Sequence, residues 1–236
     1  MPRSSFPGGT SVSLLDIYAD AAPDGICGGS PHLHLVSTEA YIVVAGRGAL
    51  QTIDSSGFQE TPLTEGVAVW FTPGTIHRAV NHDGLRVAVL MSNAGLPEAG
   101  DAVLTFPADV LADPEAYAQA ADLGAHENRA ERAARRRDLA VTGFTDLRMA
   151  VEAGDGSALA AFHEQAGRLV QERSTAWSEL VAEGPLALAQ QSLDLVTAIE
   201  DGDTRHLSEA RVRSASTFSE PGYGMCGRLR PFDVSG

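Results

Sequence analysis

The chain has 236 residues, of which 44% are hydrophobic and 20% charged, as in an ordinary globular protein able to bury a core. Its 17 basic and 31 acidic side chains give a formal charge of −14, which would repel a phosphate backbone, so no nucleic-acid partner is expected. The two cysteines, Cys27 and Cys226, have no metal-binding or redox spacing and predict free thiols.

The N-terminal segment MPRSSFPGGTSVSLLDIYADAA lacks the uninterrupted apolar core of a secretory signal. No other run approaches the roughly 18 apolar residues that a membrane-spanning helix requires. We therefore expect a cytoplasmic protein with no membrane partner.

Residues 1–110 read as one β-rich domain of short strands separated by turns. The segments YIVVA, GALQTI, VAVWF and LRVAVLM are enriched in Val, Ile and aromatic residues and are bounded by glycine-containing turns. The pair Asp83-Gly84 suits a tight hairpin turn, with His82 solvated in it. Many short strands with frequent turns predict an antiparallel sandwich or barrel.

Polar side chains interrupt this apolar pattern at two places. His32 and His34 alternate and so project from the same face of a strand, and Glu39 lies on the following strand. A second segment, GVAVWFTPGTIHRAVN, delivers His77 after a proline-glycine turn. Burying such groups is costly unless something satisfies them, and a metal ion is the leading candidate.

Residues 111–236 form a second region, which is α-helical and ends in a glycine- and proline-rich tail. Asp113, Pro114 and Glu115 predict a helix start, and residues 157–182 carry an apolar stripe at helical spacing. A further helix is expected from Pro185, with Leu186, Ala189, Leu193, Val196 and Ile199 on one face. These alanine-rich faces should pack on each other, on the barrel or on a second subunit. The final segment SEPGYGMCGRLRPFDVSG predicts a loop or a poorly ordered tail.

Charged and polar residues of the helical region show no partner pattern. The cluster RAERAARRRD contains Arg129, Arg132, Arg135, Arg136 and Arg137, for which we expect a solvated face or pairing with the chain's acids rather than an acidic partner. His126, His163 and His206 are expected on helix surfaces. The region shows no helix-turn-helix signature with a basic recognition helix, so DNA binding is not expected.

The two histidine-containing segments resemble the cupins, small antiparallel β-barrels of jelly-roll type with one metal ion. The first motif, G-x5-H-x-H-x(3,4)-E-x6-G, corresponds to His32, His34, Glu39 and Gly46, although Ile26 stands at its leading glycine. The second, G-x5-P-x-G-x2-H-x3-N, corresponds to Gly66, Gly74, His77 and Asn81, with the proline displaced to Pro73. The resemblance covers roughly residues 10–110 and implies a β-barrel there. Together with the helical region predicted from periodicity, it gives an α+β fold, a β-barrel followed by helices.

The resemblance further implies that His32, His34, Glu39 and His77 hold one divalent ion, with Glu39 also a candidate catalytic base. Three imidazoles and a carboxylate leave Mn, Fe, Ni and Zn open. Tyr41, Gln51, Phe71 and Met91 have the parity to line a pocket, although simple core packing is favoured for each of them. Asn81 lies on the face of His77 and suits a turn or a group that orients the ligands.

Two functions follow as hypotheses. The first is a metal-dependent enzyme acting on a small oxygen-rich molecule, and dioxygenase-type chemistry is favoured over sugar isomerisation or epimerisation because no acid–base group beyond Glu39 and Tyr41 stands out. The second is a non-catalytic module that binds or senses a small molecule. By resemblance, the chain is expected to form a homodimer.

Overall fold

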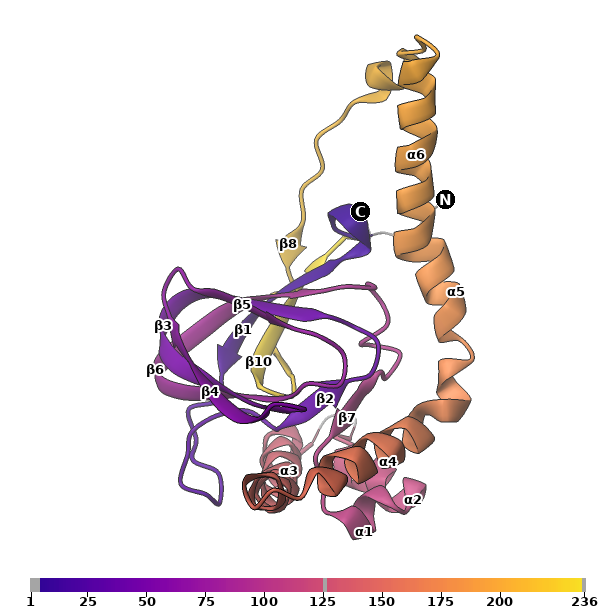
Figure 1. Cartoon of the computed structure of the whole chain (residues 1–236). Helices are drawn as coiled ribbons and strands as arrows, with labels where there is room; N and C mark the ends of the chain where they lie inside the picture. Colours follow the sequence, from indigo (N-terminus) through magenta and orange to yellow (C-terminus); the bar gives the residue numbers. More distant parts are fainter. Residues whose placement is uncertain (1–4, 125–126, 235–236) are drawn as a thin grey trace.

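The fold is an antiparallel sheet followed by helices, as the sequence predicts. Figure 1 shows the computed structural model, which describes residues 5–124 and 127–234. His126 therefore lies outside the described residues. The strands are β1 (Ser11–Ile17), β2 (His32–His34), β3 (Glu39–Asp54), β4 (Gly57–Thr64), β5 (Ala68–Phe71), β6 (Ile76–Met91), β7 (Ala102–Leu104), β8 (Ser216–Thr217), β9 (Gly222–Tyr223) and β10 (Gly227–Asp233).

Helical segments fill the interval between β7 and β8. The α-helices are α1 (Ala108–Leu111), α2 (Pro114–Ala121), α3 (Arg129–Glu152), α4 (Gly156–Ser174), α5 (Trp177–Val181) and α6 (Ala187–Glu200). Shorter segments are η1 (Pro7–Gly9), the π-helical η2 (Ala182–Leu186) and η3 (Arg205–Glu209). Among the described residues, no helix combines the length and the apolar character that crossing a bilayer requires.

The strands form one ten-stranded sheet with the order β4-β3-β6-β1-β10-β8 along its main path. Strand β2 pairs with β6 and β7, and β5 pairs with β3, so the sheet curls without closing. The main ladder joins β3 to β6 and places Thr52 opposite His77. In β2, His32 also lies opposite His77, which brings the two predicted histidine segments together.

Strands β3 and β6 are longer than the sequence suggests, because the expected hairpin at Asp83-Gly84 does not form. Each strand is 16 residues long, and β6 runs through Asp83 and Gly84. The β3–β6 register shifts between Val43 and Gly48, where Gly46 and Gly84 both have positive φ. A Cβ on Gly46 would lie 2.4 Å from the carbonyl oxygen of Asp83. The glycines therefore support a paired bulge within continuous strands, and His82 is exposed there.

The sheet separates two hydrophobic cores, which lie on its opposite faces. One contains Tyr41, Leu50, Phe71 and Ala79 and lies within the curl of the sheet. The other contains Ile53 and Ile76 and extends to helices α3 and α4 through Phe144 and Phe162. Cross-strand partners share a face, so residues paired with His77 face the side of the first core and residues paired with Arg78 face the side of the second.

The C-terminal segment corrects the prediction of a loop or disordered tail. Residues 227–233 form β10, which pairs with β1 from Ser13–Pro231 to Ile17–Gly227. Glycine and proline indicated a turn locally, whereas the partner strand lies about the whole chain away. A domain limit at residue 110 stays a prediction, but the β10 contact returns the end of the chain to the N-terminal sheet.

Helix α2 begins as predicted, and the helices differ in what they bury. Asp113 caps α2 by accepting hydrogen bonds from the amides of Glu115 and Ala116. Helix α3 packs closely on the sheet region, since a Cβ on Gly143 would lie 2.3 Å from the carbonyl oxygen of Thr105. Helix α6, all of whose residues are described, buries none of them and stands clear of the sheet (Figure 1).

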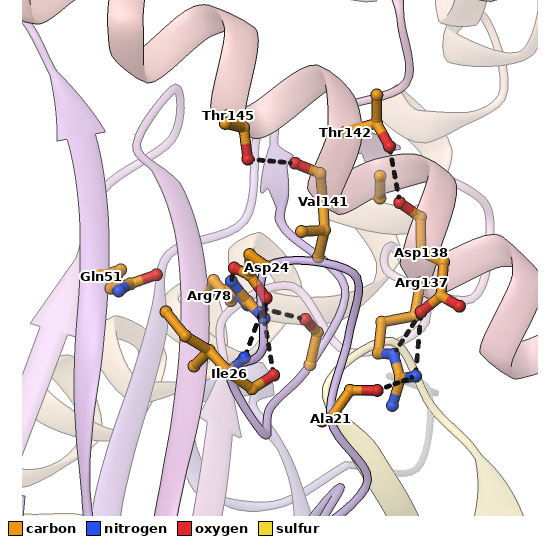
Figure 2. Close-up of polar contacts among 12 residues, drawn as sticks. Ala21, Asp24, Ile26, Gln51, Arg78, Arg137, Asp138, Val141, Thr142 and Thr145 are labelled. Atoms are coloured by element: carbon orange, nitrogen blue, oxygen red, sulfur yellow. Dashed lines mark hydrogen bonds and ion pairs between the residues drawn. The ribbon is translucent and has the colours of Figure 1, made fainter.

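Two of the clustered arginines contradict the expected solvated face. Arg132 and Arg135 form exposed ion pairs with Asp122 and Glu131, as expected. Arg136 and Arg137 are buried, because they lie on the face of α3 that packs against the sheet region. Arg137 donates to the carbonyl oxygens of Asp20 and Ala21 and pairs with Asp138 (Figure 2).

Candidate metal centre

Four side chains from three strands converge inside the curl of the sheet. His32 and His34 project from β2, Glu39 begins β3, and His77 lies near the start of β6. All four are buried, and one potential ligand atom of each lies within 4.8 Å of the others. The alternation of β2 and the His32–His77 register produce this cluster.

The three imidazoles are held in one orientation by acceptors outside the cluster. Nδ1 of His32 lies 2.9 Å from the carbonyl oxygen of Ser30, and Nδ1 of His77 lies 3.1 Å from that of Thr75. Nδ1 of His34 lies 2.7 Å from Oδ1 of Asp101. With the proton on Nδ1, each ring presents the lone pair of Nε2 to the centre, which is the arrangement of metal-ligating histidines.

Electrostatics within the cluster are strongly perturbed. Burial, together with the neighbouring His77 and His34, lowers the pKa of His32 well below its usual value. Burial would also lower the pKa of His34, but its contacts with Asp101 and Glu39 prevail and raise it to about 9. Burial would raise the pKa of Glu39, yet the adjacent His34 and His77 hold it well below the usual range. Without an ion, a proton on His34 neutralises Glu39.

Unsatisfied atoms at the centre show that these residues fit a metal ion. Nε2 of His77 and Oε2 of Glu39 are 3.1 Å apart but do not meet hydrogen-bond geometry. Both atoms are buried without a hydrogen-bond partner, which is costly for a carboxylate oxygen and an imidazole nitrogen. A divalent ion among three imidazole nitrogens and one carboxylate oxygen would satisfy both.

A cavity of about 640 Å³ opens onto this cluster. His32, His34, Glu39, Tyr41 and Met91 all line it. The Tyr41 hydroxyl donates to Sγ of Cys226 over 3.8 Å, and burial raises the pKa of that hydroxyl well above its usual value. Tyr41 and Met91 therefore lie where a pocket role would place them.

The other predicted pocket residues lie elsewhere. Gln51 pairs with Arg78 and so faces away from His77, and its amide donates to Glu60 over 2.9 Å (its position is shown in Figure 2). The register shifts between Val43 and Gly48 invalidate the simple parity count along β3. Phe71 lies outside the cavity and packs its ring on His77, with centroids 4.2 Å apart.

Asn81 contacts the backbone rather than the cluster. Its amide donates to the carbonyl oxygen of Ile17 and accepts from the amide of Leu85, across the bulge of β6. The bond with Leu85 is local and typical of a turn, whereas the bond with Ile17 ties β6 to β1.

Sequence reasoning missed Asp101 and Cys226. Asp101 is fully buried and accepts from the amide of Ser37 as well as contacting His34. An acid directly before the short apolar strand β7 was its only local signal. Cys226, a free thiol, reaches the cavity from the segment interpreted as a tail, and burial raises its pKa to about 11.

His163 also has a partner that sequence could not reveal. It lies on the exposed surface of α4, as expected, and its Nε2 is 2.9 Å from the carbonyl oxygen of Gly74. This contact ties the helical region to the turn that precedes His77.

Comparisons with known proteins identify the sheet region. Residues 20–93 match the family model described as "Cupin domain". No curated protein matches the chain significantly. Among solved structures, Pac13 from Streptomyces, described as a nucleoside dehydratase, is 12% identical over 43% of this chain and 72% of that chain, with a TM-score of 0.32.

A second solved structure, the DMSP lyase DddQ from Ruegeria pomeroyi DSS-3, is 22% identical over 42% of this chain and 45% of its own, with a TM-score of 0.32. The 11S globulin from Wrightia tinctoria is 15% identical over 35% of this chain and 20% of its own, with a TM-score of 0.30. Scores at this level carry no information on substrate or reaction.

Proposed function

Residues 20–93 of this chain form a cupin domain, and from that premise we propose that the protein is a mononuclear metal-dependent enzyme acting on a small oxygen-rich molecule. The observation that carries the proposal is the buried convergence of His32, His34, Glu39 and His77, with two polar atoms left unsatisfied at its centre. The ion would be Mn, Fe, Ni or Zn and would supply Lewis-acid chemistry to oxygen atoms of the substrate.

The cavity supports a small-molecule substrate. Its volume of about 640 Å³ lies within the roughly 300–1,000 Å³ typical of ligand pockets. Tyr41 stays protonated because its pKa is raised, so its hydroxyl can donate or accept a hydrogen bond with a bound molecule. Glu39 is the one buried carboxylate among the described residues lining the cavity, and it is the candidate base.

This set of groups favours dioxygenase-type chemistry over isomerisation. Moving a proton between two carbons of a sugar needs a second acid–base group near the ligands. The remaining carboxylate among the described lining residues, Glu98, is exposed at the edge of the cavity. The alternative is a domain that binds a small molecule without converting it.

The metal centre can be tested first by elemental analysis of protein purified without a histidine tag. We expect about one divalent ion per chain, retained in His82→Ala and lost in His34→Ala and His77→Ala. His82 is the matched control because it lies on the same strand as His77 but is exposed. Equal metal content in all four proteins would overturn the metal centre.

Activity is tested on the metal-loaded protein. Oxygen uptake with a panel of diphenols and flavonols is set against turnover of keto-sugars. Oxygen consumption that disappears in His77→Ala supports the dioxygenase assignment, whereas sugar turnover would replace it by isomerisation. A loaded protein inactive in both assays would favour the non-catalytic alternative.

We also propose that the protein forms a homodimer through α6. Its face of Leu193, Val196 and Ile199, preceded by Leu186 at the end of η2, is exposed, with Leu193 at 61% and Val196 at 54%. A helix of 14 residues depends on packing for most of its stability, and α6 buries no residue within its own chain. A second copy offers the same apolar stripe.

A further inference from the structure

A buried cation, Arg136 of helix α3, lines the same cavity as His32, His34 and Glu39 of the cluster. Only 7% of its surface is exposed. Within the described part of the chain it forms one hydrogen bond, from Nη2 to the carbonyl oxygen of Gly224 over 2.7 Å, and no ion pair. Its Nε is buried with no hydrogen-bond partner.

Burying a charged guanidinium with an unsatisfied donor is energetically costly unless an anion pairs with it. Burial lowers the pKa of Arg136, and the charged or ionisable groups that act on it are Tyr18, Tyr117, Cys226 and Arg129, none of them a carboxylate. A guanidinium stays charged in proteins and offers a planar fork of donors that suits a carboxylate or phosphate. The free donor therefore points to an anionic partner that the chain does not itself supply.

The neighbouring Arg137 shows what a purely structural buried arginine looks like in this helix. It is 4% exposed, donates to two backbone carbonyl oxygens and pairs with Asp138 (Figure 2). It does not line the cavity of the cluster. Two adjacent arginines are thus buried equally, and only the one facing the cavity lacks a charged partner among the described residues.

The charges around the cavity point the same way. With a divalent ion bound, the ion and Arg136 carry three positive charges, and Glu39 and Asp101 carry two negative charges. The net charge of these groups is then +1. The one other acidic residue among the described lining residues, Glu98, is exposed at the edge. A singly charged anion would balance the buried site.

We propose that Arg136 is the anion-recognition residue of the cavity, so that the substrate carries a carboxylate or phosphate group in addition to the oxygens directed at the cluster. That the bound anion is a substrate rests on the proposed function, but the anion site itself depends only on Arg136. The segment Tyr223–Cys226 spans the two parts of the cavity, since Gly224 accepts from Arg136 and Cys226 accepts from Tyr41.

The test measures ligand-induced shifts in melting temperature at constant ionic strength. The probes are 3,4-dihydroxybenzoate and its neutral amide, which are close in size and shape but differ in charge, together with benzoate and inorganic phosphate. We expect the wild type to bind dihydroxybenzoate roughly tenfold to a hundredfold more tightly than the amide. Benzoate and phosphate then distinguish a carboxylate site from a phosphate site.

The variants separate recognition from folding. Arg136→Gln should abolish the preference for the charged probe, and Arg136→Lys should restore part of it. Arg137→Gln should lower the melting temperature of the free protein yet keep the preference. No stabilisation by any anion beyond that of chloride, or an unchanged preference in Arg136→Gln, would overturn the inference.

The same titration on metal-free protein keeps this inference distinct from the metal centre. Benzoate or phosphate should still stabilise the metal-free wild type but not metal-free Arg136→Gln. If the metal analysis fails while this shift persists, the anion site stands and the proposed enzyme does not. If metal binds while no shift occurs, the metal centre stands and the anion site does not.

Discussion

The strands around the cluster and helix α6 are opposite extremes of one chain. In β2, all three residues are buried, and both histidines have hydrogen-bond partners, the nearby Ser30 for His32 and the distant Asp101 for His34. In α6, no residue is buried although its apolar stripe is as regular as that of α4. A periodic pattern thus predicts an element reliably, but only contacts made elsewhere decide whether its face is used within the chain.

The largest expected difference in stability is between glycine substitutions on a packed helix face and on an unpacked one. Gly143 of α3 meets the Thr105 carbonyl oxygen, whereas a Cβ on Gly167 of α4 would meet nothing within 4 Å. We expect Gly143→Ala to lower the free energy of unfolding by roughly 2–3 kcal/mol through overpacking. Gly167→Ala should raise it by about 1 kcal/mol, because alanine favours the helix.

Denaturant unfolding followed by circular dichroism measures both values. Each variant is the control for the other, since the residue change is the same and both sites are helical. Equal and small effects would show that α3 does not approach the sheet region as closely as described.

The next prediction concerns the carboxylate behind His34. Asp101→Asn keeps the shape of the side chain but removes the charge that orients His34, so metal affinity should fall roughly tenfold to a hundredfold. Competition with a chelator measures the loss. The control is Asp24→Asn, because Asp24 pairs with the buried Arg78 outside the cluster (Figure 2).

Asp24→Asn should reduce stability while metal affinity stays near the wild-type value. A similar loss of metal affinity in both variants would mean that the effect reports general destabilisation rather than the orientation of one imidazole.

These residues also show how far the sequence could be interpreted. His32, His34, Glu39 and His77 were predictable because alternation and spacing within two short segments determine which side chains meet. Asp101, Arg136 and Cys226 were not, because each reaches the site through contacts between segments far apart in the chain, and no local spacing marks them. Register, rather than composition, decides such contacts.

The errors have equally specific causes. Asp83-Gly84 is a hairpin signal, yet a second glycine at position 46 allows both strands to bulge together and continue. The C-terminal glycines and proline indicated a loop, but Pro231 lies opposite Ser13 within a β ladder. In both places the local signal is genuine and a distant partner overrides it.

A smaller effect is expected from pH. In the metal-free protein, His34 holds a proton up to its pKa of about 9, and an ion must displace that proton. Metal affinity should therefore rise with pH by up to about tenfold per unit below that value and level off above it. Calorimetric titration in buffers of different ionisation enthalpy should detect about one proton released near neutral pH. Affinity independent of pH from 6.5 to 8.5 would contradict a protonated His34.

The smallest effect on the fold itself is expected in α6. Leu193→Glu changes an exposed residue, so the free energy of unfolding of the monomer should change by no more than about 0.5 kcal/mol. The same variant should convert a dimer to a monomer in sedimentation, because a charge would enter the shared apolar stripe. Gln191→Glu adds the same charge on the opposite face of the helix and should leave the dimer intact. A wild-type monomer, or a dimer unaffected by either change, would mean that α6 is not the dimer contact, whereas loss of the dimer in Leu193→Glu alone would show that its apolar face is used between chains.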